Sequence, residues 1–184
     1  MLSDWDATYS VSSYYGGASS DITVEFDDGE SFNFEIGKKN GNRSFGLLVG
    51  HASNDISKIS DSGGSIFPST ELTSMPVLGV LGFSTQITEN LSLNLGAGAG
   101  VNFLTLEGYG QEEDDLTLQF QAKAGLELLL TEKVSLGLDY RFSVSTSPEY
   151  DGEVYSYYTG TVSDSLEGDA LLGHFIGLSV NISF

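Results

Sequence analysis

Apolar and polar residues alternate along most of this chain. The clearest case is the C-terminal segment, where every second residue from Ile176 to Phe184 is apolar and the residues between them are small or polar. A period of two predicts a β-strand, because successive side chains of a strand point to opposite faces. The alternation occurs eight times, and Pro76 interrupts the weakest case. The eight expected strands cover residues 5–12, 32–37, 44–50, 74–86, 91–103, 116–128, 134–144 and 174–184.

The connections between these strands alternate between short and long. The short ones are 38–42, 88–90 and 131–133, and the long ones are 16–29, 53–72, 106–115 and 146–169. Asn40-Gly41 is a strong hairpin signal. No helical period separates the strands, so parallel crossovers are not expected. We predict a single all-β domain over residues 1–184, an eight-stranded antiparallel up-and-down barrel.

Two closures of such a barrel compete. A soluble, lipocalin-like barrel turns its apolar face inward around a ligand, whereas a membrane barrel turns it outward to lipid. Strands of 11 to 15 residues suffice to cross a bilayer at a tilt. The polar face is rich in Gly, Ser and Asn, which are small enough for a narrow lumen. It carries few charged residues, whereas the outer surface of a soluble barrel would need many. Short turns alternating with long loops also favour the transmembrane form, with periplasmic turns and extracellular loops.

The chain resembles a known family, the outer membrane protein β-barrel domain, the eight-stranded group related to OmpA, OmpX and the Opa adhesins. The resemblance covers nearly the whole chain and is carried by 20–29, 50–56, 95–101, 136–142 and the final Phe184. It implies the bacterial outer membrane, with lipids as surroundings. The alternating Leu178, Val180 and Ile182 before Phe184 resemble the signal read by the barrel-assembly machinery. The family usually has an aromatic residue at the position of His51.

Composition narrows the function classes. The 184 residues include 26 acids and 7 bases, a formal charge of -19, which argues against nucleic acid as a partner. Without Cys and with two His, no thiol nucleophile, zinc site or other cofactor is expected. No stretch approaches 18 consecutive apolar residues, and the first residues do not resemble a signal peptide. An exported protein would therefore be a processed form.

The charges are segregated along the predicted topology. Nineteen of the 26 acids fall in or beside the long connections, together with one base, Lys58, while Lys38, Lys39, Arg43 and Lys133 lie near the short turns. The acidic loops are either a solvated surface or a rim that attracts divalent cations or a basic surface partner. This pattern was not used to place the strands, so it supports the topology separately.

Five charged residues fall on the inward parity: Glu35, Lys123, Glu127, Asp139 and Arg141. Charges inside a narrow barrel need partners or water, since an isolated buried charge is strongly unfavourable. We therefore predict that Lys123 and Arg141 pair with some of the three acids. The resulting network either fills and stabilises the lumen or gates a narrow path for water or ions.

Two further motifs were weighed for function. His51-Ala52-Ser53-Asn54 resembles the His-x-Ser-Asn run of outer-membrane lipid A deacylases, but the Glu expected about a dozen residues later is missing and position 65 is Ser. We expect no catalytic residues and no enzyme. Four tyrosines in the last long connection form a candidate partner-binding loop. They are Tyr150, Tyr155, Tyr157 and Tyr158.

The sequence thus predicts a non-catalytic outer-membrane barrel with a structural or surface-interaction, adhesin-like role. A narrow channel for small solutes or apolar compounds is the alternative, and a soluble ligand-binding barrel is a third reading.

Overall fold

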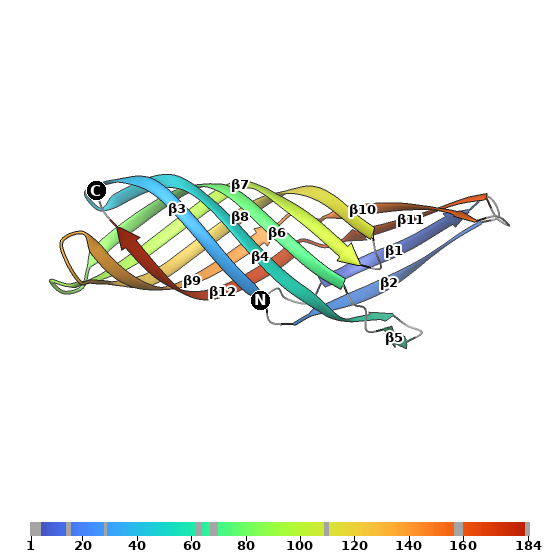
Figure 1. Cartoon of the computed structure of the whole chain (residues 1–184), viewed down its shortest axis with the longest axis horizontal. Coiled ribbons are helices and arrows are strands. Elements are labelled where there is room, and N and C mark those ends of the chain that lie inside the picture. The colour runs from blue at the N-terminus through green and yellow to red at the C-terminus, as the bar shows by residue number, and fades with distance from the viewer. Residues whose placement is uncertain are drawn as a thin grey trace.

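A computed structural model shows an all-β chain in which strands wind around one long axis (Figure 1). It describes residues 5–13, 16–27, 29–61, 64–66, 70–108, 111–156 and 160–182. All strand pairings between these residues are antiparallel. The strands are β1 (Trp5–Ser13), β2 (Gly16–Phe26), β3 (Glu30–Asn40), β4 (Arg43–Asp61), β5 (Gly64–Ile66), β6 (Thr70–Gln86), β7 (Leu91–Gly108), β8 (Gln111–Leu129), β9 (Val134–Ser145), β10 (Glu149–Ser156), β11 (Gly160–Gly168) and β12 (Leu171–Ile182).

These strands build the predicted eight-stranded meander. Brief interruptions split three of the long strands into β2 with β3, β9 with β10, and β11 with β12. The pairing order runs from β12 through β9, β8, β7, β6, β4, β2 and β1 to β11, which continues into β12. The first predicted strand is therefore β1, and it lies between β11 and β2. At Gly41 the backbone takes a φ of 60°, as a two-residue hairpin turn between Asn40 and Arg43 requires.

The expected long loops are largely strand, which corrects the sequence analysis. Residues 16–26, 53–61, 104–108, 111–115 and 149–156 continue their ladders beyond the apolar part of the wall. Backbone hydrogen bonds join paired strands whatever their side chains are. The strands can therefore extend beyond the residues in which apolar and polar side chains alternate. We call this end of the molecule the loop end and the end with the short connections the turn end.

The alternation sorts side chains as the membrane reading predicts. Large apolar residues of the long strands point outward and are exposed, among them Phe34, Leu81, Leu118, Leu138 and Leu178. Polar residues of the opposite parity are buried inside, including Asn102, Gln119 and Ser143. This arrangement is the reverse of a soluble ligand-binding barrel, so the lipocalin-like alternative is wrong.

At the loop end β1 joins β11 to β2, although no ladder among the described residues joins β10 to β8, and the wall is open at the turn end. Within the described residues, no hydrogen-bonded pairing joins β3 to β12, and each of these strands is paired along one edge only. We call the opening between them the slot. No helix among the described residues has the length and apolar character needed to cross a membrane.

Candidate functional site

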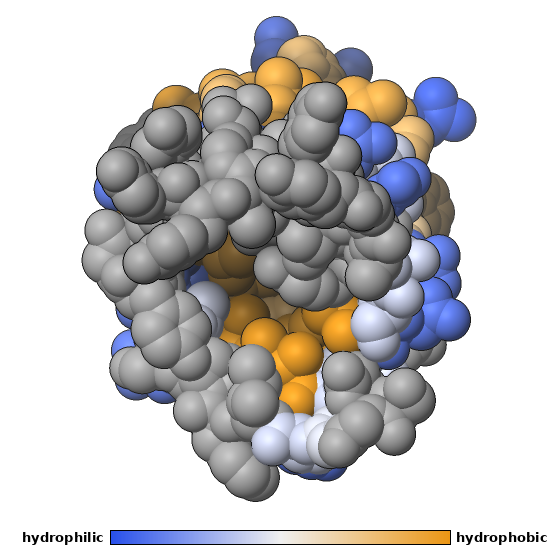
Figure 2. All heavy atoms as spheres, turned by 90° about the vertical axis from the view of Figure 1, so that its right-hand side faces the viewer, coloured by the Kyte–Doolittle hydropathy of each residue, from blue (hydrophilic) through white to orange (hydrophobic). Residues whose placement is uncertain are grey.

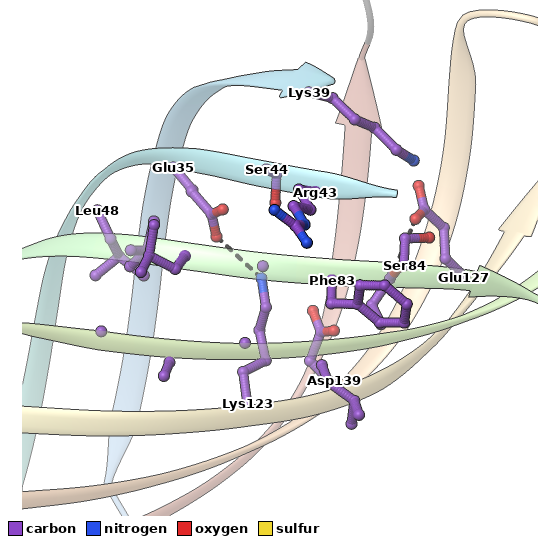
Figure 3. Close-up of a pocket in the computed structure, with 18 of the residues that line it drawn as sticks. Glu35, Lys39, Arg43, Ser44, Leu48, Phe83, Ser84, Lys123, Glu127 and Asp139 are labelled. Atoms are coloured by element: carbon purple, nitrogen blue, oxygen red, sulfur yellow. Dashed lines mark hydrogen bonds and ion pairs between the residues drawn. The ribbon is translucent and has the colours of Figure 1, made fainter. Parts of the chain in front are cut away.

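A polar cavity of about 190 Å³ lies in the lumen at the turn end (Figure 3). It lies where the inward faces of β3, β4, β6, β7, β8, β9 and β12 meet. Three acids and three bases line it, so their formal charges cancel. They are Glu35, Glu127, Asp139, Lys39, Arg43 and Lys123.

An ion pair crosses this cavity. The ammonium of Lys123 on β8 donates to Glu35 Oε2 on β3 at 3.0 Å, as Figure 3 shows. Gly96 is the cross-strand neighbour of Lys123 on β7. A Cβ added at Gly96 would lie 3.6 Å from Lys123 Cε, an ordinary van der Waals contact, so a side chain larger than that of alanine would crowd the lysine stem.

Glu127 is the centre of a second set of hydrogen bonds, in which the donors are neutral side chains. Its carboxylate accepts hydrogen bonds from Asn94 Nδ2 at 2.6 Å, from Asn181 Nδ2 at 3.3 Å and from Ser135 Oγ. The donors come from β7, β12 and β9, so one side chain of β8 links three other strands of the wall. In Figure 3 the ammonium of Lys39 points toward this carboxylate.

Arg141 does not join this network as expected. The register places it opposite Lys123, and within the described residues it makes no ion pair with Glu35, Glu127 or Asp139. Its buried Nη1 atom has no hydrogen-bond partner there. The pairing predicted for Arg141 is therefore wrong, since Glu35 is already engaged by Lys123 and Glu127 by neutral donors.

Sequence reasoning missed two bases of the cavity. Lys39 has the same parity as Glu35 on β3, so the alternation could have assigned it to the lumen. Arg43 has the outward parity of Phe45 and reaches the cavity only because it is the first residue of its strand. The sequence analysis places both near the short turns without assigning them to the lumen.

Above this cavity, buried polar side chains occupy the lumen. They line a cavity of about 30 Å³ at mid-height, which has room for one or two water molecules. Asn102 accepts a hydrogen bond from Ser74 Oγ at 2.8 Å and donates to Ser145 Oγ at 3.3 Å. The buried Asn54 Oδ1 and Gln119 Oε1 atoms, whose residues line the cavity, have no protein partner in the described part.

The loop end of the lumen is apolar. Figure 2 looks onto this end and shows apolar residues inside its hollow. Its buried cluster, here called the apolar cap, draws on six strands: it comprises Val24, Ile56, Leu72, Leu104, Tyr150 and Leu171. No residue of the cap belongs to the predicted polar network, so the lumen is polar at one end and apolar at the other.

Tyr150 is part of that cap and is only 4 % exposed. Its predicted exposure to a partner is therefore wrong. Burial raises the pKa of its phenol, and the nearby carboxylates of Asp115, Glu113 and Asp114 raise it further. The side chains of Tyr155, Tyr157 and Tyr158 lie outside the described residues.

The outer face of the loop end carries carboxylates above the apolar part of the wall. Asp55, Glu107, Glu112 and Asp114 are exposed there, and the ion pair of Lys58 with Glu25 at 2.6 Å neutralises one further acid. Within the described residues no group of three or more His, Asp or Glu side chains has the arrangement of a metal site.

The two histidines contact aromatic rings. His51 lies against Phe32, with ring centroids 5.2 Å apart, and Ser53 Oγ donates to Glu71 instead of to His51. His174 Nδ1 is hydrogen-bonded to Tyr140 OH at 2.7 Å, and the His174 ring lies in tilted contact with Phe142, with centroids 5.1 Å apart. Neither contact supplies the serine–base hydrogen bond that a nucleophilic hydrolase needs.

On β12, Leu178, Val180 and Ile182 are exposed on the outer face, while Phe184 lies outside the described residues.

Comparison with known proteins identifies the fold. No protein-family model and no curated protein sequence matches the chain. Among solved structures, it is similar to the outer membrane protein OprG from Pseudomonas aeruginosa, at 11% identity, over 97% of this chain and 95% of that one, with a TM-score of 0.50. Neisserial surface protein A has 15% identity over 94% and 95% of the two chains, with a TM-score of 0.48. The chain thus has the fold of the eight-stranded outer membrane β-barrels.

Proposed function

We propose that this protein is an integral protein of the bacterial outer membrane that presents an acidic, strand-built surface to the outside and does not conduct solutes. The outward apolar residues face lipid, the turn end faces the periplasm, and the loop end projects from the cell. The protein performs no chemistry of its own.

The observation that carries this proposal is the filled middle of the lumen. The cavity that the mid-height residues line has a volume of only about 30 Å³, and the buried residues of the apolar cap lie above it. A hydrated solute needs a continuous path, and a constriction lined by apolar residues excludes water. The polar network at the turn end is then a structural filling of a narrow barrel, in keeping with its cancelling charges.

Recordings in planar lipid bilayers test this proposal. We expect no unitary conductance from the protein, and a measurable conductance only when the mid-height residues and the cap are cut back together, as in Asn54→Gly/Gln119→Gly/Leu72→Gly/Leu104→Gly. Asn94→Gly, at the already open turn-end cavity, is the matched control and should conduct no better than the unaltered protein. Well-resolved conductance steps of the unaltered protein would contradict the proposal.

The acidic outer face indicates a cationic partner. Exposed carboxylates on adjacent strands create a negative potential that attracts cations, either divalent metal ions or a basic surface on another molecule. Polylysine is a suitable probe, and its binding should weaken as salt rises. Glu112→Gln/Asp114→Asn should reduce the binding, whereas Glu89→Gln at the turn end should not. Equal losses in the two variants would remove the loop end from this role.

A second function is favoured by the apolar cap. Because Leu72, Leu104 and Leu171 face the lumen, a small apolar compound could be held there and passed onward. The fluorescent probe N-phenyl-1-naphthylamine tests this possibility. Leu104→Asn should weaken its binding at least tenfold if the cap is a binding site, and the outward-facing Leu95→Asn serves as the control. Identical binding by both variants would rule out the cap.

Two sequence expectations complete the proposal. The barrel-assembly machinery recognises the C-terminal strand through Leu178, Val180, Ile182 and Phe184, and Phe184→Ala should lower the amount of protein in the outer membrane. Tyr155, Tyr157 and Tyr158 provide contact area for a surface partner.

A further inference from the structure

We propose that the cavity of about 190 Å³ at the turn end binds a small zwitterion, a molecule that carries a primary ammonium and a carboxylate or phosphate a few bonds apart. The ammonium contacts Asp139, and the anionic group contacts Arg43. A free amino acid and the phosphoethanolamine headgroup of a membrane lipid share this chemistry. This role goes beyond the surface role proposed above, and it needs no path through the lumen.

Two of the six charged residues that line the cavity are left without a partner. One acid and one base form the ion pair that crosses the cavity. The carboxylate of Glu127 accepts hydrogen bonds from two asparagines, and the ammonium of Lys39 points toward it in Figure 3. No ion pair or side-chain hydrogen bond in the described part of the chain engages Asp139 or Arg43. One carboxylate and one guanidinium are therefore available to a ligand.

Asp139 is the buried member of the two. It lies on β9 with only 9 % of its surface exposed, and in Figure 3 its carboxylate points into the cavity. Its neighbour on β8 is Gly125, where an added Cβ would collide with Asp139 Oδ1, so a side chain at this position would displace the carboxylate. A carboxylate this deeply buried needs hydrogen-bond donors and a compensating charge. A primary ammonium supplies both.

Arg43 is the accessible member. It is the first residue of β4 and is exposed, yet its guanidinium reaches the cavity (Figure 3). The planar guanidinium carries five N–H donors, and two of them can bind one carboxylate or phosphate at the same time. A ligand bound to both residues therefore places its ammonium deep in the cavity and its anionic group at the more exposed end.

The size and net charge of the cavity also favour a small zwitterion. Its volume is well below the roughly 300–1,000 Å³ of sites for drug-sized ligands. Gly82, Gly96 and Gly98 are among its lining residues, so little of the space is taken by their side chains. The three acids and three bases of the lining cancel. A simple ion of either sign would upset this balance, whereas a zwitterion leaves it unchanged.

Isothermal titration calorimetry of the protein in detergent tests the ligand class. Glycine and O-phosphoethanolamine are the probes, while acetate and ethylamine each carry only one of the two charges. We expect saturable binding of at least one zwitterion, and binding of acetate and ethylamine that is weaker by about tenfold or more. Failure of both zwitterions to bind would overturn the proposal, and so would equal affinity for either single-charge compound.

Two substitutions test the assignment of the contacts. Arg43→Gln and Asp139→Asn should each weaken binding of the zwitterion by about tenfold or more. Lys38→Gln is the matched control, because Lys38 is exposed on the same hairpin but does not line the cavity, and it should leave the affinity unchanged. Arg43 is exposed at a strand end, so its variant provides the test even if Asp139→Asn fails to insert. Unchanged affinity in Arg43→Gln would overturn the proposal.

Lipid nanodiscs distinguish the two sources of the ligand. The same titration is repeated in phosphatidylcholine alone and in phosphatidylcholine mixed with phosphatidylethanolamine. The choline headgroup has no N–H to donate to Asp139, so it does not compete for the site. Weaker binding of the soluble zwitterion in the mixed discs would assign the site to the lipid headgroup, and equal binding would assign it to a soluble zwitterion. Conductance recordings test only the filled lumen, so the two proposals can fail independently.

Discussion

The ammonium of Lys123 lies 3.0 Å from the carboxylate of Glu35, although 88 residues separate the two along the chain. The pair connects β8 with β3 across the lumen, near the opening of the slot. The two side chains are 24 % and 33 % exposed, so water only partly screens their interaction, and each charge depends on the other for compensation.

Removing one member of this pair should destabilise the barrel. Lys123→Met leaves Glu35 uncompensated and should lower the free energy of unfolding by about 1 to 2 kcal/mol, less than for a fully buried pair. The double variant Lys123→Met/Glu35→Gln should recover part of the loss. Urea unfolding in lipid vesicles measures both values. Lys58→Met breaks the pair on the outer face and should cost less than about 1 kcal/mol. If the two lysine substitutions lower the free energy of unfolding equally, then the ion pair in the lumen is no stronger than the one on the outer face.

Leu138→Arg tests whether the outward residues face lipid. Leu138 is 52 % exposed, so an arginine there would be harmless if water surrounded the wall. Beside hydrocarbon the same change should cost about 2 to 4 kcal/mol near the bilayer midplane. Unfolding in vesicles provides the measurement, and Glu89→Arg in a short turn provides the control. A cost near zero for Leu138→Arg would refute the membrane orientation of the wall.

The sequence predicted the wall better than its ends. Alternation located the strands around Leu95, Leu126 and Leu138 because one face of each is apolar throughout, and that face is the one turned outward in the structure. The strand extensions at the loop end carry acidic residues on the outer face and apolar ones such as Ile56 and Leu104 inside, so the apolar parity of the wall does not continue into them. The slot was not predicted either. Alternation shows on which face of the sheet a residue lies, but not which strand is hydrogen-bonded beside it.

The alternation of inward and outward residues also limits what the sequence can predict about the candidate site. It placed Lys123 and Glu35 on the same lumen, and the structure brings them into contact. It could not assign partners, since these depend on the stagger between strands. Arg141 lies opposite Lys123, and no carboxylate in the described part of the chain forms an ion pair with it. For Tyr150 the error has another cause: a tyrosine in an acidic polar stretch was taken as exposed, whereas its ring is buried in the apolar cap with residues from five other strands.

Alkaline pH should destabilise the loop end through Tyr150. Burial and neighbouring carboxylates raise the pKa of this phenol in the folded state, whereas in the unfolded chain it ionises near pH 10. The unfolded state therefore releases a proton that the folded state retains, and stability should fall as pH rises above about 10, by up to about 1.4 kcal/mol per pH unit.

Tyr150→Phe isolates this effect from the other tyrosines. Its hydroxyl has no partner among the described residues, so at pH 8 the variant should match the unaltered protein within about 1 kcal/mol. Above pH 10 it should lose stability less steeply, as followed by unfolding at a series of pH values. Parallel pH profiles would show that Tyr150 ionises freely.

Gly96→Val should disturb the path of Lys123. A Cβ at this position would lie 3.2 Å from the backbone oxygen of Leu81 and 3.6 Å from Lys123 Cε, and the two methyl groups of valine would crowd the lysine stem further. We expect a loss of about 1 to 3 kcal/mol in unfolding free energy. Part of this loss should vanish in the Lys123→Met background, since both changes act on the same ion pair.

Gly79→Val is the matched control on the outer face of β6. A Cβ there has one neighbour, the backbone oxygen of Ala99 at 3.8 Å, and valine suits an exposed strand position better than glycine does. This variant should be neutral or slightly stabilising, with the same effect whether or not Lys123 is present. If Gly96→Val and Gly79→Val cost the same, or if the effect of Gly96→Val is unchanged without Lys123, then the glycine does not serve the lysine, and its place in the strand has another cause.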